Sequence, residues 1–167
     1  RAWVLPVVGL ILLAISGVML MGHLGRLAGV LQVAGYPTTG IGAEGYATMA
    51  FGLFVIIDLI VCLAKKKSSA AVTRIAGVFG LILLIAMGYA YFELAGIPQW
   101  GSATSFATFV LGGLALGASL GAFFADGGYE NARVRTCSIV FVLLGTLALL
   151  IEIAPFAGAE LPVWPFI

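Results

Sequence analysis

Charged side chains are scarce in this chain of 167 residues. Asp, Glu, Lys and Arg together make up 9% of the sequence, whereas about a quarter of an average soluble domain is charged. A water-soluble globule needs a polar surface, and seven acids and eight bases are too few to cover one of this size. The shortage of charge therefore excludes a soluble domain, and a hydrophobic content of 62% excludes a disordered chain.

Cysteine, histidine and net charge are low as well. Cys62 and Cys137 form no CxxC pair, so the cysteines give no framework for iron–sulfur ligation or disulfides. His23 is the only histidine of the sequence, so the paired axial ligands of a bis-histidine haem are missing. A net charge of +1 gives no basic field for nucleic acid. We therefore expect no haem, metal or nucleic acid on this chain, and we interpret both cysteines as small apolar residues.

Long apolar runs are what the sequence has instead, and its mean hydropathy is +1.18. An α-helix needs about 20 apolar residues to cross a hydrocarbon core of roughly 30 Å. Lipid offers the backbone no hydrogen-bond partner, so segments of this kind are expected to be helical. We predict an all-α, polytopic transmembrane bundle that forms a single domain over residues 1–167, with five spans at about 3–21, 46–64, 72–94, 103–125 and 137–154.

Lysine and arginine are concentrated in two of the predicted loops. The loop after the second span and the loop after the fourth span together hold Lys65, Lys66, Lys67, Arg74, Arg133 and Arg135. The two loops lie on the same side of the membrane if every segment crosses, and an excess of lysine and arginine marks the cytoplasmic side. We therefore expect both basic loops in the cytoplasm and the remaining loops outside.

Polar and aromatic residues gather at the outward ends of the predicted spans. This group consists of His23, Arg26, Glu44, Tyr91, Glu93, Trp100 and Glu152. Taken singly, each has an ordinary explanation, such as a charge at a helix end, a snorkelling side chain or a place in the aromatic belt. Their convergence on one depth of the membrane favours a functional site, in which Glu93 and Glu152 are candidates for handling protons.

Asp58 is separate from this group, because it falls in the inner half of the second span. A buried acid in a span can be part of a proton path. No chain of polar residues along the span joins Asp58 to Glu44, however. We therefore favour a hydrogen bond between Asp58 and a hydroxyl or backbone carbonyl of a neighbouring span over a role in proton handling.

Glycines recur every four residues in the fourth span, at Gly113, Gly117 and Gly121. This spacing places all three on one face of the helix, and small residues let helix backbones approach closely in membranes. We interpret the stripe as a packing feature, and we predict that another helix lies close against it.

An imidazole and carboxylates beside apolar walls at the edge of the membrane suit a quinone. The quinone head needs hydrogen-bond partners, and its reduced form releases protons that need a nearby base. His23 and Glu44 are the candidates for both tasks. Composition alone leaves two alternatives open. One is a small carrier or channel with an outward-facing acidic site, for which polar residues should continue across the midplane; the other is a purely structural anchor.

Two motifs follow one another in a distinctive order. His23-Leu24-Gly25 comes before Glu44 at the start of the second span, and Tyr91 comes before Ile97-Pro98-Gln99-Trp100 ahead of a glycine-rich span. From about residue 5 to residue 124, this arrangement resembles the membrane-anchor (DmsC) family of bacterial dimethyl sulfoxide reductases, within the broader NrfD/polysulfide-reductase membrane-subunit group. The sequence departs from the family at Tyr89, where the family often has arginine.

The resemblance implies an eight-span subunit of the bacterial cytoplasmic (inner) membrane, of which this chain corresponds to spans two to six. Family members oxidise menaquinol near the outer face in anaerobic respiration, and they carry no haem. Their partners are a four-cluster iron–sulfur subunit and a molybdopterin catalytic subunit, so the chain alone would have no complete oxidoreductase activity. By this resemblance His23 and Glu44 would oxidise the quinol, and we expect Arg26, Tyr91 and Trp100 to complete the site.

Overall fold

The computed structural model describes residues 2–24, 35–93, 101–124 and 130–154, with the side chains of residues 20, 21, 23 and 24 outside this description. Within these ranges the chain forms helices and no strand, which confirms the all-α class. In chain order the helices are α1 (Val4–Leu24), α3 (Gly40–Lys65), α4 (Ala70–Phe92), α5 (Ala103–Phe124) and α6 (Ala132–Ile153).

Four of the described helices, α3, α4, α5 and α6, are long and apolar enough to cross a membrane. They correspond to the second to fifth predicted spans, as expected of a multi-pass membrane protein. The described apolar stretch of α1, Val4–Met19, is shorter. At 1.5 Å per residue it covers roughly 24 Å, somewhat less than a full hydrocarbon core. Crossing of the membrane by the first predicted span therefore stays a prediction.

Capping residues explain why two helices begin earlier than their apolar runs. Helix α3 begins at Gly40 because the Thr39 hydroxyl accepts a hydrogen bond from the Gly42 backbone N–H, with an N–O distance of 3.1 Å. Helix α6 begins at Ala132 because the Asn131 side chain accepts the N–H of Arg133 at 3.0 Å. Side-chain oxygens at these positions satisfy backbone donors that a helix otherwise leaves unpaired. The helices thus extend beyond the hydrophobic segments that predict them.

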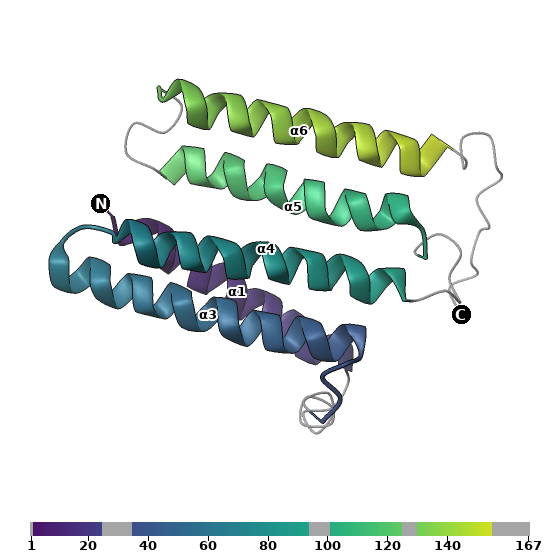
Figure 1. Cartoon of the computed structure of the whole chain (residues 1–167), viewed down its shortest axis with the longest axis horizontal. Helices are drawn as coiled ribbons and strands as arrows, with labels where there is room; N and C mark the ends of the chain where they lie inside the picture. Colours follow the sequence, from purple (N-terminus) through teal and green to yellow (C-terminus); the bar gives the residue numbers. More distant parts are fainter. Residues whose placement is uncertain (1, 25–34, 94–100, 125–129, 155–167) are drawn as a thin grey trace.

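The helices α3, α4, α5 and α6 lie side by side as an antiparallel row, and α1 packs behind α3 (Figure 1). Neighbours along the chain pair most extensively, so α3 and α4 form one hairpin and α5 and α6 form a second. Contacts between α4 and α5 join the two hairpins, and α1 contacts α3 and, only slightly, α5. Among the described helices α6 therefore contacts α5 alone.

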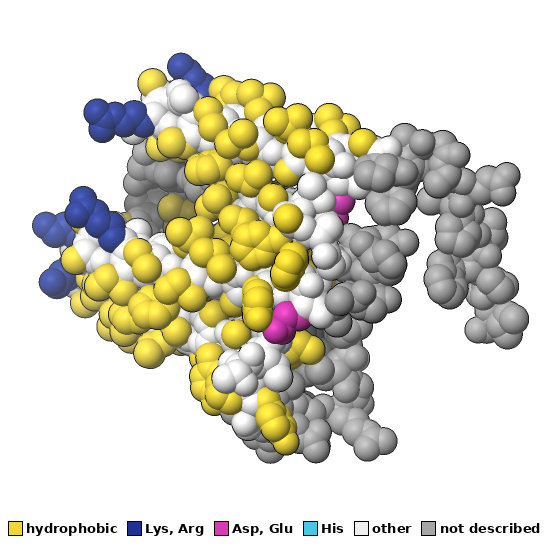
Figure 2. Space-filling model, turned by 45° about the vertical axis from the view of Figure 1, so that its right-hand side comes forward, with side chains coloured by type: hydrophobic (Ala, Val, Ile, Leu, Met, Phe, Trp, Pro, Cys, Tyr) yellow, Lys and Arg dark blue, Asp and Glu magenta, His cyan; other side chains and the backbone are white. Residues whose placement is uncertain are grey.

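Small residues fill the seams between neighbouring helices. The buried residues of α5 and α6 are Ser105, Ala115, Ala122, Ser138, Gly145 and Ala148. In contrast, large apolar side chains such as Val18, Leu116 and Phe123 are mostly exposed, and hydrophobic side chains are spread over the helices on the face that Figure 2 shows. Lipid replaces water around membrane helices, so close backbone packing and hydrogen bonds hold them together.

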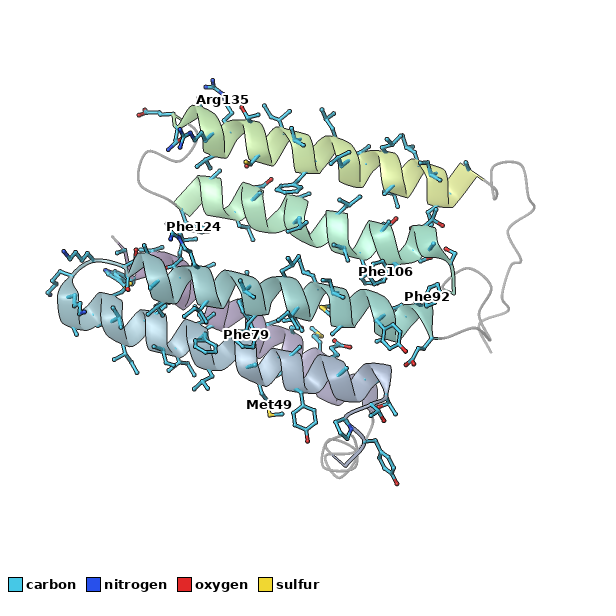
Figure 3. All side chains as sticks on the ribbon, viewed as in Figure 1. Met49, Phe79, Phe92, Phe106, Phe124 and Arg135 are labelled. Atoms are coloured by element: carbon cyan, nitrogen blue, oxygen red, sulfur yellow. The ribbon has the colours of Figure 1, made fainter. Side chains whose placement is uncertain are left out.

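Figure 3 shows one large side chain that points outward and one that lies between two helices. Met49 points away from the bundle, whereas Phe106 lies between α4 and α5. A Cβ atom at Gly88 would meet the Phe106 ring at 2.9 Å, so the absence of a side chain at Gly88 makes room for the ring. The seam between the hairpins is therefore shaped by a glycine of α4 and an aromatic ring of α5.

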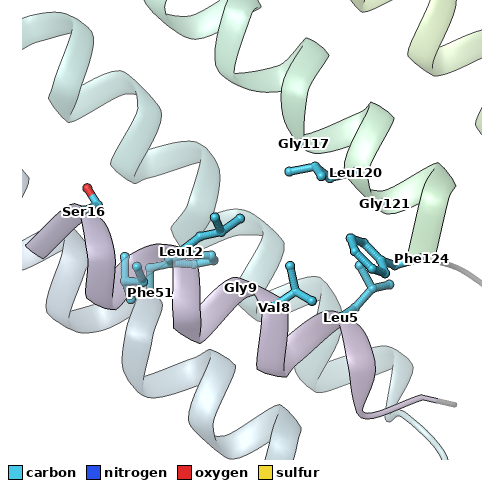
Figure 4. Close-up of a pocket in the computed structure, with 11 residues that line it drawn as sticks. Leu5, Val8, Gly9, Leu12, Ser16, Phe51, Gly117, Leu120, Gly121 and Phe124 are labelled. Carbon is cyan, nitrogen blue, oxygen red and sulfur yellow. The ribbon is translucent and has the colours of Figure 1, made fainter.

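The glycine stripe of α5 behaves as predicted at one of its three positions. A Cβ atom at Gly113 would collide with the Leu84 side chain of α4. At Gly117 and Gly121 it would meet none of the described residues within 4 Å. These two glycines line an open apolar groove of about 340 Å³ between α1, α3 and α5 (Figure 4). The prediction of close helix packing was wrong there because the stripe turns from α4 toward α1, which contacts α5 only slightly.

Candidate functional site

The described basic side chains gather at one end of the bundle, and three of the described acids lie at the other end. The described cations Lys65, Lys66, Lys67, Arg74, Arg133 and Arg135 lie where α3 ends and where α4 and α6 begin. Figure 2 shows these basic side chains together at one end, with acidic side chains farther toward the other. The antiparallel order puts Glu44, Glu93 and Glu152 at that other end, which we call the acidic end. The two basic loops therefore lie at the same end of the bundle, as predicted.

Glu93 connects the end of α4 to the beginning of α3. Its carboxylate accepts a hydrogen bond from the Gly40 backbone N–H, with an N–O distance of 2.8 Å. Gly40 packs so tightly on α4 that an added Cβ atom would lie 2.6 Å from the Ala90 Cα atom. The Tyr89 hydroxyl also hydrogen-bonds to Glu93. A carboxylate at a helix N-terminus satisfies an unpaired N–H and interacts favourably with the helix dipole, so Glu93 has a clear structural role.

Glu152 makes the corresponding connection in the second hairpin. Its carboxylate accepts a hydrogen bond from the Ser105 hydroxyl at 2.6 Å. Ser105 is 1% exposed and lies in the first turn of α5. Thr108, one turn farther along α5, has a buried hydroxyl oxygen without a hydrogen-bond partner in the described part of the chain. Glu152 of α6 therefore lies beside a hydroxyl-rich stretch of α5 at the acidic end.

Glu44 differs from both of these acids. It lies partly buried in the second turn of α3, and it makes no hydrogen bond or ion pair with the residues that the structure describes. The three acids thus converge on one end of the bundle, as predicted, but they do not form one cluster. Glu93 belongs to the α3–α4 seam and Glu152 to the α5–α6 seam, whereas Glu44 has no hydrogen-bond partner among the described residues.

The helix register places the backbone of His23 within about one turn of the level of Glu44. Cβ atoms built at Gly9 and Gly52 would contact Val55 and Leu13 respectively. These contacts show that α1 runs antiparallel to α3, with residue 9 opposite 55 and residue 13 opposite 52. Both helices rise about 1.5 Å per residue, so this register brings the backbone of His23, in the last turn of α1, level with the first two turns of α3. The side chain of His23 lies outside the described residues.

Tyr91 provides an aromatic surface at the same end of the bundle. Its ring stacks on Phe109 of α5, with ring centres 4.3 Å apart and planes inclined by 14°. The pair lies in the seam between α4 and α5, where the two hairpins meet. The other predicted site residues, Arg26 and Trp100, fall outside the described part of the chain, so their roles stay predictions.

Asp58 is accounted for by a hydrogen bond within the first hairpin. It is 6% exposed and accepts a hydrogen bond from the Thr73 hydroxyl of α4 at 3.2 Å. Of the two predicted kinds of partner on a neighbouring helix, a hydroxyl or a backbone carbonyl, the structure shows the hydroxyl. Cys62, one turn beyond Asp58, is buried, whereas Cys137 is exposed. The alternative of a carrier or channel is not tested by this contact and stays a prediction.

Serine and threonine around Glu152 were not singled out from the sequence. Ser102, Thr104, Ser105 and Thr108 occur within seven consecutive positions at the start of α5. This density of hydroxyl groups is visible in the sequence. The sequence does not show that α5 packs against α6, which brings these hydroxyl groups beside an acid 47 positions from Ser105.

No protein-family model, curated protein or solved structure matches the chain. Within the described residues, no group of three or more His, Cys, Asp or Glu side chains is arranged to hold a metal ion. Assignment of a function therefore depends on the chemistry of the acidic end and on the motif resemblance described above.

Proposed function

We propose that this chain is the membrane anchor and menaquinol-oxidising subunit of a molybdopterin reductase complex in anaerobic respiration. The observation that carries the proposal is Glu44, a partly buried carboxylate without a hydrogen-bond partner among the described residues, at the acidic end of a bundle of apolar helices. The motif resemblance to the dimethyl sulfoxide reductase anchors supports the same function. In this family the chain corresponds to spans two to six of an eight-span subunit.

Oxidation of a quinol removes two electrons and two protons, so its site needs proton acceptors close to the hydroxyl groups. A carboxylate and an imidazole are suitable general bases near neutral pH. Glu44 has no hydrogen-bond partner among the described residues, and the backbone of His23 lies within about one turn of its level in the neighbouring helix α1. In the proposed mechanism, His23 accepts a proton or holds one quinol oxygen, and Glu44 orients His23 or takes the second proton.

Aromatic residues complete the proposed site. The stacked rings of Tyr91 and Phe109 offer a flat apolar surface near the acidic end, and aromatic faces pack well against other ring systems. Arg26 and Trp100 are the further proposed contacts of the quinol head. The isoprenoid tail needs lipid-facing apolar surface, which the outer faces of the helices provide.

Electrons leave toward partner subunits in this proposal. A four-cluster iron–sulfur subunit receives them, and a molybdopterin subunit reduces the terminal acceptor, so neither group needs ligands in this chain. We propose that the basic end faces the bacterial cytoplasm, because lysine and arginine favour that side. The acidic end then lies near the outer face of the inner membrane, where quinol protons are released.

Binding of a fluorescent menaquinol-site inhibitor to membranes with the assembled complex tests the proposal. Replacing Glu44 by glutamine removes the negative charge and the strong acceptor while keeping the size of the side chain. We expect Glu44→Gln to weaken saturable binding by about tenfold or more, the effect of losing a charged hydrogen bond of roughly 1.5–3 kcal/mol.

Glu130→Gln is the matched control, because Glu130 is an exposed acid beside the basic end. Its inhibitor affinity should equal that of the original protein. Equal affinities for Glu44→Gln and Glu130→Gln, in complexes assembled to the same level, would refute the assignment of Glu44 to the quinol site.

A further inference from the structure

The start of α5 carries a continuous chain of hydroxyl groups that ends on an acid. The Thr104 and Ser102 hydroxyl oxygens lie 2.8 Å apart, and those of Ser102 and Ser105 lie 3.0 Å apart. The Ser105 hydroxyl then donates to the Glu152 carboxylate at 2.6 Å. From these hydrogen bonds we infer that Glu152 exchanges its proton with the water at the acidic end through Ser105, Ser102 and Thr104.

The direction of the hydrogen bonds fits such a relay. A serine or threonine hydroxyl has one hydrogen to donate and can accept as well. Ser105 donates its hydrogen to Glu152, so Ser102 is the donor in the contact between the two serines. Since Ser102 has then used its own hydrogen, Thr104 is the donor to Ser102. All three hydroxyls therefore point toward Glu152, and each bond polarises the next one.

The middle of the hydroxyl chain is its buried part. Ser105 is 1% exposed, whereas Ser102 and Thr104, at the N-terminal end of α5, and Glu152 are only partly buried. A proton from water at Thr104 can thus reach Glu152 by shifts of successive O–H hydrogens. Each hydroxyl gains one hydrogen and passes on another, so the net change is one proton on the carboxylate. Release follows the same path after the hydroxyls turn.

No other ionisable side chain of α5 or α6 lies near Glu152. Helix α5, its neighbour among the described helices, has no ionisable side chain, and the other ionisable groups of α6 are Arg133, Arg135 and Cys137 at the basic end. Fifteen positions separate Cys137 from Glu152, which is roughly 22 Å along a helix. Tyr89 and Tyr91 belong to α4, and Glu93 follows its last residue. Helix α4 contacts α5 but not α6. The hydroxyl chain is therefore the direct polar partner of Glu152 in the described part of the bundle.

The relay stands on these hydrogen bonds and does not depend on the proposed quinol site. Ser102 also has a structural task, because its oxygen accepts the backbone N–H of Ser105 at 3.1 Å and caps α5. A test must therefore separate capping from proton transfer. Asparagine caps helices as well as serine does, but its amide has no hydroxyl that accepts and donates through one atom.

The experiment follows protonation of Glu152 by time-resolved infrared spectroscopy after a pH jump, with the full chain in lipid nanodiscs. The difference spectrum against Glu152→Gln identifies its carboxyl band. We expect Ser102→Asn to slow proton exchange by about tenfold or more, and we expect Ser102→Thr to keep the original rate. Thr108→Val is the control, because the Thr108 hydroxyl lies outside the chain of hydrogen bonds.

An unchanged exchange rate in Ser102→Asn would overturn the relay, since water would then reach Glu152 by another path. Equal slowing in Ser102→Asn and Thr108→Val would also overturn it. Because the experiment contains no quinol, its outcome is independent of inhibitor binding at Glu44. A failed relay leaves the proposed quinol site intact, and a failed quinol site leaves the relay intact.

Discussion

Glu44→Gln is expected to lower the rate of menaquinol oxidation by the assembled complex about a hundredfold or more. The carboxylate of Glu44 is partly buried and has no hydrogen-bond partner among the described residues, so it is available to a quinol hydroxyl. Glutamine preserves the shape of the side chain but does not accept a proton. The measurement is the steady-state oxidation of a water-soluble menaquinol analogue by membranes that contain equal amounts of complex.

Two further variants sharpen this experiment. Glu44→Asp keeps a carboxylate on a shorter side chain, and we expect it to retain more activity than Glu44→Gln. Glu130→Gln removes an exposed acid at the basic end and should leave the rate within about twofold, because surface charges far from a site have small effects. If Glu44→Gln oxidised the analogue as fast as Glu130→Gln, proton transfer to Glu44 would be ruled out.

Gly40→Ala should destabilise the α3–α4 hairpin by roughly 3 kcal/mol, from overpacking and loss of a hydrogen bond. The added Cβ atom would lie 2.6 Å from the Ala90 Cα atom and 2.8 Å from the Glu93 carboxylate. A backbone atom cannot rotate away, so the two helices must separate, which breaks the bond from Gly40 to Glu93. Unfolding of the purified protein in mixed detergent micelles measures the loss.

Gly45→Ala is the matched control within the same helix. A Cβ atom at Gly45 would meet none of the described residues within 4 Å, and alanine favours a helix over glycine by about 1 kcal/mol. We therefore expect Gly45→Ala to be neutral or stabilising. Similar losses in both variants would mean that the close contact between Gly40 and Ala90 does not hold the hairpin together.

Hydrophobicity predicts the helices of this chain well because a membrane span must be a long apolar helix. The ends of the helices are less predictable. Thr39 and Asn131 begin α3 and α6 ahead of their apolar runs, and such caps depend on local hydrogen bonds rather than on hydropathy. The sequence therefore places the four helices that are long enough to span a membrane, but it predicts the starting points of α3 and α6 too late.

Side-chain partners were the least predictable feature, because they depend on the rotation and order of the helices. The sequence places Glu93 and Glu152 at one end, but it does not indicate that each acid connects the two helices of a different hairpin. For the same reason it does not show that Gly117 and Gly121 line an open groove. The prediction of a hydrogen bond between Asp58 and a neighbouring helix was correct, since a buried carboxyl requires a hydrogen-bond donor.

Photolabelling of the assembled complex with a menaquinone analogue that carries a reactive group on its ring tests the central claim most directly. Labelled positions are mapped by mass spectrometry, with unlabelled menaquinone as competitor. The proposed site predicts competed labels in the first two turns of α3, around Glu44, and near Tyr91. Competed labels confined to the groove between α1 and α5, or to the basic end, would contradict quinol oxidation at Glu44.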